Sequence, residues 1–399
     1  MRRCSSPSIR CWKLNLGARV MKIVSVQGYE VVVPVRPGAV DSADWTVSAQ
    51  AKPWSEWPIV LVELRFSDGL TGLGEVGRGH SLKEIEADLR ALVGFEPRGL
   101  DLSALPLERS QPLGLVLEKH MPDPTWVTTS PIAGAVEMAL LDWAGKRLGC
   151  RAVDLLGGVV RQRVTVDYWC GRQTPSDLAK TVEQAARRGF TGLKMKARLG
   201  DPTLEQVKVV KATGGAEFGL TIDPMHQWHS PVYVLPLLRA LEPYARGLKL
   251  EDPVPKEHPS QWLRLQQASV IPLVWHARGS ADMVRALESR CADGFNCSGG
   301  IQEFLQQAQL CAFLGLPCWQ GSSLELGVAQ AARLHAAAAS PACVWPSDLQ
   351  GALVREHTLT TWSWPYEDGS LPLPDGLGLG VELDRQALRH FARAEADFR

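Results

Sequence analysis

The chain has 399 residues, of which 45% are hydrophobic and 22% charged, and its 43 basic and 43 acidic residues give a formal net charge of +0. This neutral balance gives no electrostatic case for binding nucleic acid or an anionic membrane surface, and the longest apolar runs are too short to cross a bilayer. The length accommodates one barrel of about 250 residues and a second, smaller domain.

Residues 1–20 differ in character from the rest of the chain. They contain five basic residues and no acidic one: Arg2, Arg3, Arg10, Lys13 and Arg19. They lack the apolar core of about 7–15 residues that a signal peptide needs. A strand pattern begins at Met21. We therefore expect a leader that is disordered or not translated, with a targeting presequence as the alternative.

The opening part of the chain predicts an α+β capping domain over residues 21–145. Its strands are expected at 22–35 and 58–76, and its helices at 81–93 and 131–148. The strand regions alternate or run apolar with β-branched residues, and Ser67-Asp68-Gly69 marks a hairpin turn, so the sheet should be antiparallel.

A polar loop at residues 36–57 separates the two strand regions and contains Trp45, Trp54 and Trp57. A loop of this length without its own structure is usually either functional or disordered. The tryptophans favour a lid, and a flexible linker is the alternative.

Four apolar runs in the middle of the chain end in charged residues at a nearly constant spacing. They end at Lys196, Asp223, Glu251 and His276, which are 27, 28 and 25 residues apart. One strand, one helix and two loops use about this many residues, so the spacing predicts a β/α repeat. The strand ends of such a barrel share one mouth, where its chemistry is found.

The remaining barrel elements follow from the same alternation of strands and helices. The first strand is expected at 161–168, later strands at 294–297 and 316–320, and helices at 203–213, 301–314 and 325–339, with N-caps at Thr174, Ser230 and Ser280. The eighth strand is not located and is expected within 328–354. The predicted fold is a (β/α)8 barrel over 146–355, with a segment at 356–399 packing back on the cap.

Lysines and carboxylates at these strand ends form a candidate site. Lys194 and Lys196 alternate with Met195, so both should face the barrel interior, where one of two neighbouring cations can become a general base. Asp223 and Glu251 are a natural pair of ligands for a hard cation such as Mg2+. The alternatives are a solvated lysine pair and carboxylates that cap the next helices.

The motifs, taken together, resemble the enolase superfamily in its mandelate racemase and muconate lactonizing branch. They are Lys194-Met-Lys196, Ile222-Asp-Pro-Met-His-Gln-Trp228, Leu250-Glu-Asp-Pro253 and Gly299-Gly-Ile301, and the likeness spans roughly residues 22–395. The resemblance implies that Lys196 takes a proton α to a carboxylate and that Lys194 and Mg2+ hold the enediolate. Asp223 and Glu251 would be the first two metal ligands, and the protein would be a homo-oligomer.

The chain departs from the family pattern at four places. Ala277 stands at the expected third acidic ligand, and Met225 replaces an asparagine. No lysine lies between residues 293 and 299, and no histidine lies within 318–322, where Gln320 or a neighbour stands instead. With two acids and no third, the metal affinity is expected to fall unless His276 or a water fills the position, and an imidazole would favour Mn2+ over Mg2+.

With a base on one face only, the sequence favours a lyase over a two-base racemase. We expect a metal-dependent dehydratase acting on a hydroxy-carboxylate such as an acid sugar, with His226, His276 or Lys196 protonating the leaving hydroxyl. Asn296, Gln320 and His276 are the expected substrate contacts. The alternatives are an isomerase of the same superfamily and a non-catalytic protein that binds a carboxylate.

Three further expectations concern individual side chains and location. Glu325 is expected to cap the helix that it begins, with a place in the lining of the mouth as the alternative, and His335 is expected to be a core residue. No two of the nine cysteines form a C-x-x-C pair, which argues for reduced thiols and against a disulfide scaffold or a zinc site. The expected location is the cytoplasm.

Overall fold

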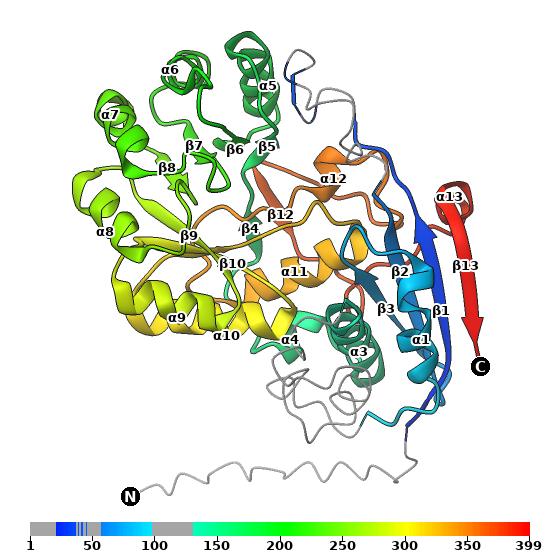
Figure 1. The fold of residues 1–399 in the computed structure, drawn as a ribbon. Helices are drawn as coiled ribbons and strands as arrows, with labels where there is room; N and C mark the ends of the chain where they lie inside the picture. Colours follow the sequence, from blue (N-terminus) through cyan, green and yellow to red (C-terminus); the bar gives the residue numbers. More distant parts are fainter. Residues whose placement is uncertain (1–20, 37–38, 40, 43–44, 46–56, 98–130) are drawn as a thin grey trace, which may run out of the picture.

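The computed structural model describes residues 21–36, 39, 41–42, 45, 57–97 and 131–399 (Figure 1). The expected leader at 1–20 and most of the loop at 36–57, including Trp54, lie outside these residues. Within the described ranges, none of the helices has the length and apolar character that a membrane crossing requires.

The cap is built on a four-stranded antiparallel sheet in the order β13-β1-β2-β3. The strands are β1 Ile23–Val31, β2 Ile59–Phe66, β3 Thr71–Val76 and β13 Ala392–Phe398, and the helices on the sheet are α1 Leu82–Ala91 and α3 Ala133–Leu148. The predicted turn at 67–69 joins β2 to β3, and Ser81 caps α1 by accepting a hydrogen bond from Glu84 N. The C-terminal segment therefore supplies one strand of the cap sheet.

Helix α3 lies unusually close to strand β3, and glycine is what permits this. A Cβ on Gly72 would stand 1.9 Å from Ala139 O, and one on Gly74 would stand 2.0 Å from Ala135 O. Any side chain at either position would push the helix off the sheet. The cap thereby acquires its own core between sheet and helices, separate from the core of the barrel.

The second sheet is parallel and curls into most of a barrel, with helices on its outer side (Figure 1). Its strands are β5 Tyr168–Cys170, β6 Gly192–Lys196, β7 Gly219–Asp223, β8 Leu248–Glu251, β9 Leu273–Arg278, β10 Gly294–Ser298 and β11 Cys318–Gln320. The intervening helices are α5 Pro175–Arg187, α6 Thr203–Gly214, α7 Pro231–Leu241, α8 Pro259–Ala268, α9 Ser280–Ser289, α10 Ile301–Leu314 and α11 Gly327–Ala339. This confirms the predicted strand–helix alternation and the barrel-type fold with an N-terminal cap.

The remaining short elements are α4 Ala152–Leu155, β4 Arg163–Thr165, η4 Glu242–Tyr244, α12 Gly351–Val354, β12 Ser370–Pro372 and α13 Arg385–Phe391. The eighth barrel position, which the sequence did not locate, is filled by irregular chain. Ser347 forms an isolated parallel bridge with Val166, and Asp348 N donates to Gln320 O over 2.9 Å. This segment forms no regular hydrogen-bond ladder, and its sequence has no strand pattern by which it could be located.

Two local predictions were wrong. The first barrel strand is β5, whereas residues 163–165 form β4 and pair with β12 outside the barrel. The alternating exposure of β4 suits a half-exposed antiparallel strand, and the fully buried β5 suits a parallel barrel. At α9 the N-cap is Gly279, not Ser280, because the chain there has a φ of 100° that glycine adopts readily. The expected domain limits remain a prediction.

Candidate active site

Two lysines on β6 point into the barrel. Lys194 and Lys196 occupy alternate positions, and Met195 between them is buried on the side that faces the helices. In the register with β7, Lys194 is opposite Thr221 and Lys196 is opposite Asp223. The predicted alternation is therefore present, and both ammonium groups share one interior.

Lys194 is enclosed by three carboxylates. Its Nζ lies 2.6 Å from Glu251 Oε2, 2.8 Å from Asp348 Oδ2 and 3.5 Å from Asp223 Oδ2. Burial alone would lower the pKa of Lys194, but the charges of the carboxylates outweigh burial and raise that pKa well above its ordinary value. Lys194 therefore stays an ammonium, which suits it to holding negative charge and not to accepting a proton.

Lys196 lies nearer the open end of the barrel. Its side chain is 18% exposed, against 5% for Lys194, and its Nζ forms an ion pair with Asp223 Oδ2. Of the two amines, Lys196 is the one that a bound molecule can reach.

The carboxylates of Asp223 and Glu251 are both buried, and their surroundings shift them in opposite directions. Burial opposes ionisation of Asp223, but the charges of Lys196 and Lys194 outweigh burial and hold its pKa well below the usual range. Burial and repulsion from Asp223 raise the pKa of Glu251, although Lys194 partly offsets this. The surroundings thus favour the ionised form of Asp223 and the protonated form of Glu251.

Asp348 is a site residue that the sequence analysis missed. It lies in the irregular segment that closes the barrel, and its Oδ2 accepts hydrogen bonds from Trp319 Nε1 at 3.2 Å and Asn296 Nδ2 at 3.4 Å. The one available signal was an acidic residue in the stretch where the last strand was expected. Without a strand pattern, no inward-facing position could be assigned there.

His276, and not Ala277, faces the carboxylates. His276 Nδ1 lies 3.6 Å from Glu251 Oε1, and its Nε2 lies 3.1 Å from Ser298 Oγ. Ala277 is fully buried on the opposite side of β9, so the third-ligand position that we assigned to it was wrong by one residue. Burial, together with Lys194, lowers the pKa of His276 well below its ordinary value, which keeps the imidazole neutral.

Of the two predicted substrate contacts on β10 and β11, Asn296 faces the barrel interior and Gln320 does not. Asn296 faces inward and donates from Nδ2 to Glu251 Oε1 over 2.8 Å. Trp319 is opposite Asn296 in the register and also faces inward, with Lys194 Nζ 5.6 Å from its ring centre. Gln320 therefore takes the outward position, where its Nε2 donates to Gly321 O, and the expectation that it faces substrate was wrong.

His226 is not brought into this cluster. Its ring nitrogens lie 3.2 Å from Val254 O and 3.3 Å from Asp252 Oδ2, and it lines an outer groove with Lys256. Met225, where the family pattern has asparagine, uses its backbone N–H to donate to Asp223 Oδ1 over 2.9 Å.

The donor set fits a hard divalent cation. Asp223 and Glu251 are buried carboxylates, and Glu251 Oε2 accepts no hydrogen bond within the described residues, although Lys194 lies beside it. A neutral imidazole, that of His276, lies next to them. Among the residues that the structure describes, these side chains do not bring three ligand atoms within 4.8 Å of one another. Lys194 Nζ stands between the two carboxylates.

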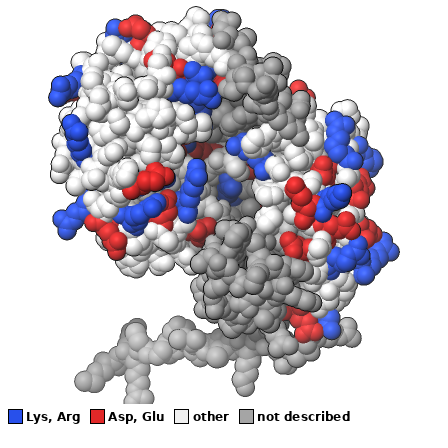
Figure 2. Space-filling view, viewed as in Figure 1, with Lys and Arg blue, Asp and Glu red and all other residues white. Residues whose placement is uncertain are grey.

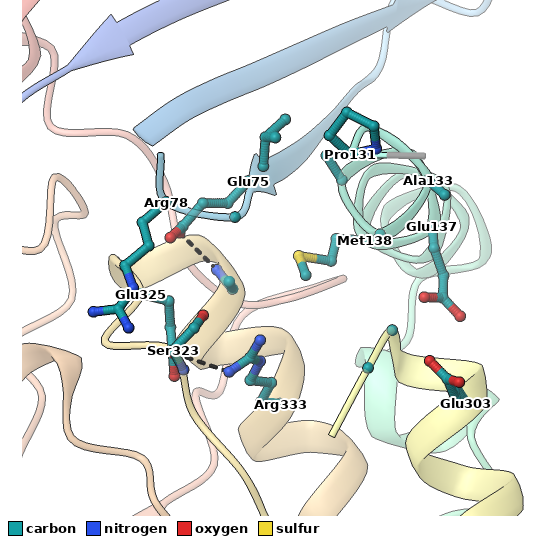
Figure 3. A pocket seen from close by; sticks show the side chains of 17 residues that line it. Glu75, Arg78, Pro131, Ala133, Glu137, Met138, Glu303, Ser323, Glu325 and Arg333 are labelled. Atoms are coloured by element: carbon teal, nitrogen blue, oxygen red, sulfur yellow. Dashed lines mark hydrogen bonds and ion pairs between the residues drawn. The ribbon is translucent and has the colours of Figure 1, made fainter. Parts of the chain in front are cut away.

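Residues of the cap and the barrel line a cavity of about 210 Å3 beside the mouth (Figure 3). Glu325 lines this cavity and accepts from Arg333 Nη1 over 2.9 Å, so the expectation that it caps α11 was wrong. Glu75 of the cap domain instead accepts hydrogen bonds from backbone N–H groups at the start of α11, from Leu326 N at 2.6 Å and Ala329 N at 3.0 Å.

A second cap carboxylate repeats this arrangement at the next helix. Glu137 on α3 accepts from Ile301 N at 2.7 Å and Gln302 N at 2.6 Å, at the start of α10. The partial positive charge of a helix N-terminus favours a carboxylate there. Burial nevertheless raises the pKa values of Glu75 and Glu137 to about 7 each, and the backbone hydrogen bonds only partly offset it.

The surface around the mouth carries mixed charge. Figure 2 shows lysine and arginine side chains interspersed with aspartate and glutamate over the face viewed.

His335 is fully buried, as the sequence predicted. Its Nδ1 accepts a hydrogen bond from Val153 N, and its Nε2 lies 3.1 Å from Leu379 O.

Known proteins resemble this chain over nearly its whole length. Residues 177–387 match the family described as Enolase C-terminal domain-like, and residues 39–157 match the Mandelate racemase / muconate lactonizing enzyme N-terminal domain. Muconate cycloisomerase 1 of Pseudomonas putida is 29% identical over 355 residues, which cover 84% of this chain and 90% of that protein.

Two solved structures share the fold. The N-succinyl Arg/Lys racemase from Bacillus cereus has a TM-score of 0.79 at 20% identity, covering 95% of this chain and 100% of that one. The muconate cycloisomerase from Pseudomonas fluorescens has a TM-score of 0.74 at 24% identity, covering 94% and 99%.

Proposed function

Because this chain is an enzyme of the enolase superfamily, in its mandelate racemase and muconate lactonizing branch, we propose that it is a lyase acting on a hydroxy-carboxylate. In this proposal it removes the α-proton and eliminates the β-hydroxyl as water. The expected substrates are acid sugars, and the expected cofactor is Mg2+ or Mn2+.

The observation that carries the proposal is the charge of the buried cluster. Two ammonium groups share the barrel interior with three carboxylates, those of Asp223, Glu251 and Asp348. If every carboxyl were ionised, one negative charge would be uncompensated in a dry interior, and the raised pKa of Glu251 reflects this cost. With Lys196 as the ammonium, a divalent cation would leave the cluster one charge positive. With Lys196 as the free amine that acts as the base, the same cation would leave it neutral before the substrate binds.

Asp223 and Glu251 would hold the cation, with His276 beside them, and the cation would supply positive charge to the oxygens of the substrate carboxylate. Lys194 adds a permanent ammonium close to the same place. The neutral imidazole of His276 suits Mn2+ better than Mg2+.

Lys196 performs the proton transfers. As the free amine it takes the α-proton, and the electron pair of the broken C–H bond moves into the carboxylate to give an enediolate. The enediolate then expels the β-oxygen, which takes the same proton back from the Lys196 ammonium and leaves as water. The enol that remains becomes a 2-keto acid.

Lys196 is also the better acid for the departing hydroxyl. The depressed pKa of His276 leaves it without a proton to give near neutral pH. His226 bonds to Asp252 and Val254 in the outer groove, away from Lys196. A single group serving both steps implies that proton and hydroxyl leave from one face of the substrate.

An unused acceptor favours a substrate with hydroxyl groups. Asn296 Oδ1 is buried without a hydrogen-bond donor among the described residues. Its orientation is fixed, because Asn296 Nδ2 must face the two carboxylates to which it donates. A hydroxyl of an acid sugar would supply the missing donor.

An isomerase is the second candidate, and the names of the similar proteins favour it. Muconate cycloisomerase 1 and the N-succinyl Arg/Lys racemase are both isomerases by name. The same enediolate could be reprotonated or closed into a ring. A two-base racemase is disfavoured, since no lysine or histidine of β10 or β11 faces Lys196 within the described residues.

The experiment is α-proton exchange. The protein is incubated in D2O with Mg2+ or Mn2+ and a library of acid sugars, other hydroxy acids and N-acyl amino acids, and each α-proton is followed by NMR. Loss of the α-proton with a product lighter by one water supports the lyase. The activity should vanish in Lys196→Ala and persist in Lys208→Ala, which alters an exposed lysine paired with Glu205.

Other outcomes distinguish the candidates. Exchange with no change of mass would favour the isomerase. Silence across the library, from protein shown to be folded and metal-loaded, would overturn the lyase proposal.

The expected cellular compartment and oligomeric state also remain proposals. The seven cysteines within the described ranges are all free thiols, which supports a reducing compartment such as the cytoplasm. We propose a homo-oligomer on the family resemblance, to be checked by light scattering of the purified protein.

A further inference from the structure

Four cysteines that are far apart in the sequence gather behind the barrel wall. We refer to Cys297, Cys311, Cys318 and Cys343 as the thiol cluster; they come from β10, α10, β11 and the turn after α11. The Sγ atoms of the first three all lie within 4.8 Å of one another. Each of the four is a free and buried thiol.

The arrangement follows from strand alternation. Asn296 and Trp319 face the barrel interior, so Cys297 and Cys318 face the helix layer, where α10 presents Cys311. Cys343 follows closely on Ala342, whose carbonyl accepts from Cys318 N over 2.9 Å. Its Sγ lies 3.4 Å from Ser347 Oγ. No C-x-x-C spacing is needed, because the sheet register brings the ligands together.

The cluster has the character of a site for a soft cation. Hydrogen bonds from Cys297 and Cys318 lower the pKa of Cys311, whereas burial raises that of Cys297 well above its usual value. The cluster thus pairs buried thiols with one thiol whose surroundings favour the thiolate. A hydrogen bond with Cys318 lowers the pKa of Cys343, and the nearby charge of Arg161, which donates to Ala337 O and Ser340 O, adds to this.

We propose that the thiol cluster is a closed structural site for one thiophilic d10 cation, Zn2+ or Cu+. Cys297, Cys311 and Cys318 would supply three thiolates and Cys343 the fourth ligand. A zinc–sulfur bond is about 2.3 Å, so tetrahedral ligands lie about 3.8 Å apart. The sulfur atoms of Cys297, Cys311 and Cys318, within 4.8 Å of one another, need only a small contraction, and Cys343 Sγ would have to move closer to complete the set. Zn2+ with four thiolates has two negative charges, of which Arg161 would offset one.

The position would let this cation cross-link three elements of the barrel. It would join β10, β11 and α10 on the side opposite to Asn296 and Trp319. The cation would thus hold β10 and β11, which carry site residues, in place from the helix side of the sheet. The cation would be separate from the Mg2+ or Mn2+ expected inside the barrel, which prefers oxygen ligands.

The test uses the full-length reduced protein, freed of metal with a chelator and kept in excess Mg2+ so that the carboxylate site is occupied. Zn2+, Cu+ and Cd2+ are titrated separately. Binding is read as thiolate-to-metal charge-transfer absorption with Cd2+, as stoichiometry by elemental analysis, and as a rise in Tm. We expect one ion per chain and a Tm rise of several degrees at saturating metal.

Variants assign the site. Cys311→Ala should lose the charge-transfer band and the Tm rise, whereas Cys170→Ala, which alters a fully buried cysteine on β5, should keep both. If Cys311→Ala fails to fold, loss of Tm when the wild-type protein meets a thiol-selective chelator gives the same answer. The proposal is overturned if the folded reduced protein binds none of the three metals, or if Cys311→Ala binds them unchanged. A native disulfide between two of the four cysteines would also overturn it.

Discussion

Lys194 Nζ and Asp348 Oδ2 lie 2.8 Å apart and thereby tie the second strand of the barrel sheet to the segment that closes the barrel. This segment is irregular, so a buried ion pair does here part of what a strand ladder does elsewhere in the wall. The same ammonium also separates Glu251 from Asp223. Its loss should therefore affect both the closure of the barrel and the electrostatics of the site.

Replacing Lys194 with methionine should destabilise the protein by about 3–5 kcal/mol at pH 7.5, because three buried carboxylates would lose their shared cation. The raised pKa of Lys194 means that its contribution is fully present below about pH 10 and is lost only above that. Urea unfolding measures the change. Lys208→Met, at an exposed pair with Glu205, should leave the free energy of unfolding nearly unchanged, because water screens the pair. Equal effects of the two variants would contradict this account.

His276→Ala should lower the affinity for Mn2+ more than that for Mg2+, because a neutral imidazole is a better ligand for the softer ion. The readout is the rise in Tm with each metal, which reports binding to the native state. The exposed residue His258 provides the control variant, His258→Ala, which should leave both affinities unchanged. An equal loss for both metals would place His276 outside the coordination sphere.

The free energy of unfolding should fall as pH rises from about 4.5 to about 7. Glu75 and Glu137 each have a pKa of about 7 in the folded protein, so the native state keeps a proton that the unfolded chain releases at about 4.5. At most about 3 kcal/mol is lost per group across this window.

Glu137→Gln tests this pH dependence, since the amide cannot titrate. Its unfolding free energy should change less between pH 5.5 and 7.5 than that of the wild-type protein. Glu257→Gln, which alters an exposed residue, should keep the wild-type slope. An unchanged slope in Glu137→Gln would show that the Glu137 carboxylate is already ionised, favoured by the N-terminus of α10.

Gly321→Ala should reduce activity more than it reduces stability. The added Cβ would stand 2.4 Å from Asn296 Oδ1 and 3.1 Å from Cys297 O, and the backbone oxygen cannot move aside. Asn296 would then be displaced from Glu251. Gly134→Ala is the matched control, since a Cβ there meets nothing within 4 Å and the residue lies in helix α3. Steady-state kinetics on the substrate found by proton exchange would compare the two variants.

The sequence predicted those parts of the fold that have a period or a cap. The strand ends at Lys196, Asp223 and Glu251 lie where the spacing placed them, and Thr174 caps α5 by accepting from Asp177 N. The closing segment around Asp348 has neither signal, so a central member of the site could not be assigned. Family resemblance could not supply it either, because the motifs that we recognised end before residue 348.

The errors on β9 and β11 have a common cause. A strand reverses the direction of its side chains at each residue, so a misplacement of one position exchanges inside for outside. This is why Ala277 was expected in place of His276, and Gln320 in place of Trp319. The closeness of the four cysteines could not be predicted from the sequence. It depends on the register between β10 and β11, which no local sequence pattern determines.

Strand β13 at residues 392–398 pairs with β1 at residues 23–31, so the edge of β1 is covered by a segment that leaves the ribosome long after β1 itself. Until then β1 presents open N–H and C=O groups, the kind of edge that recruits strands from other chains. Nascent or C-terminally shortened copies of this protein should therefore depend on chaperones, and should aggregate through the cap while the barrel remains intact.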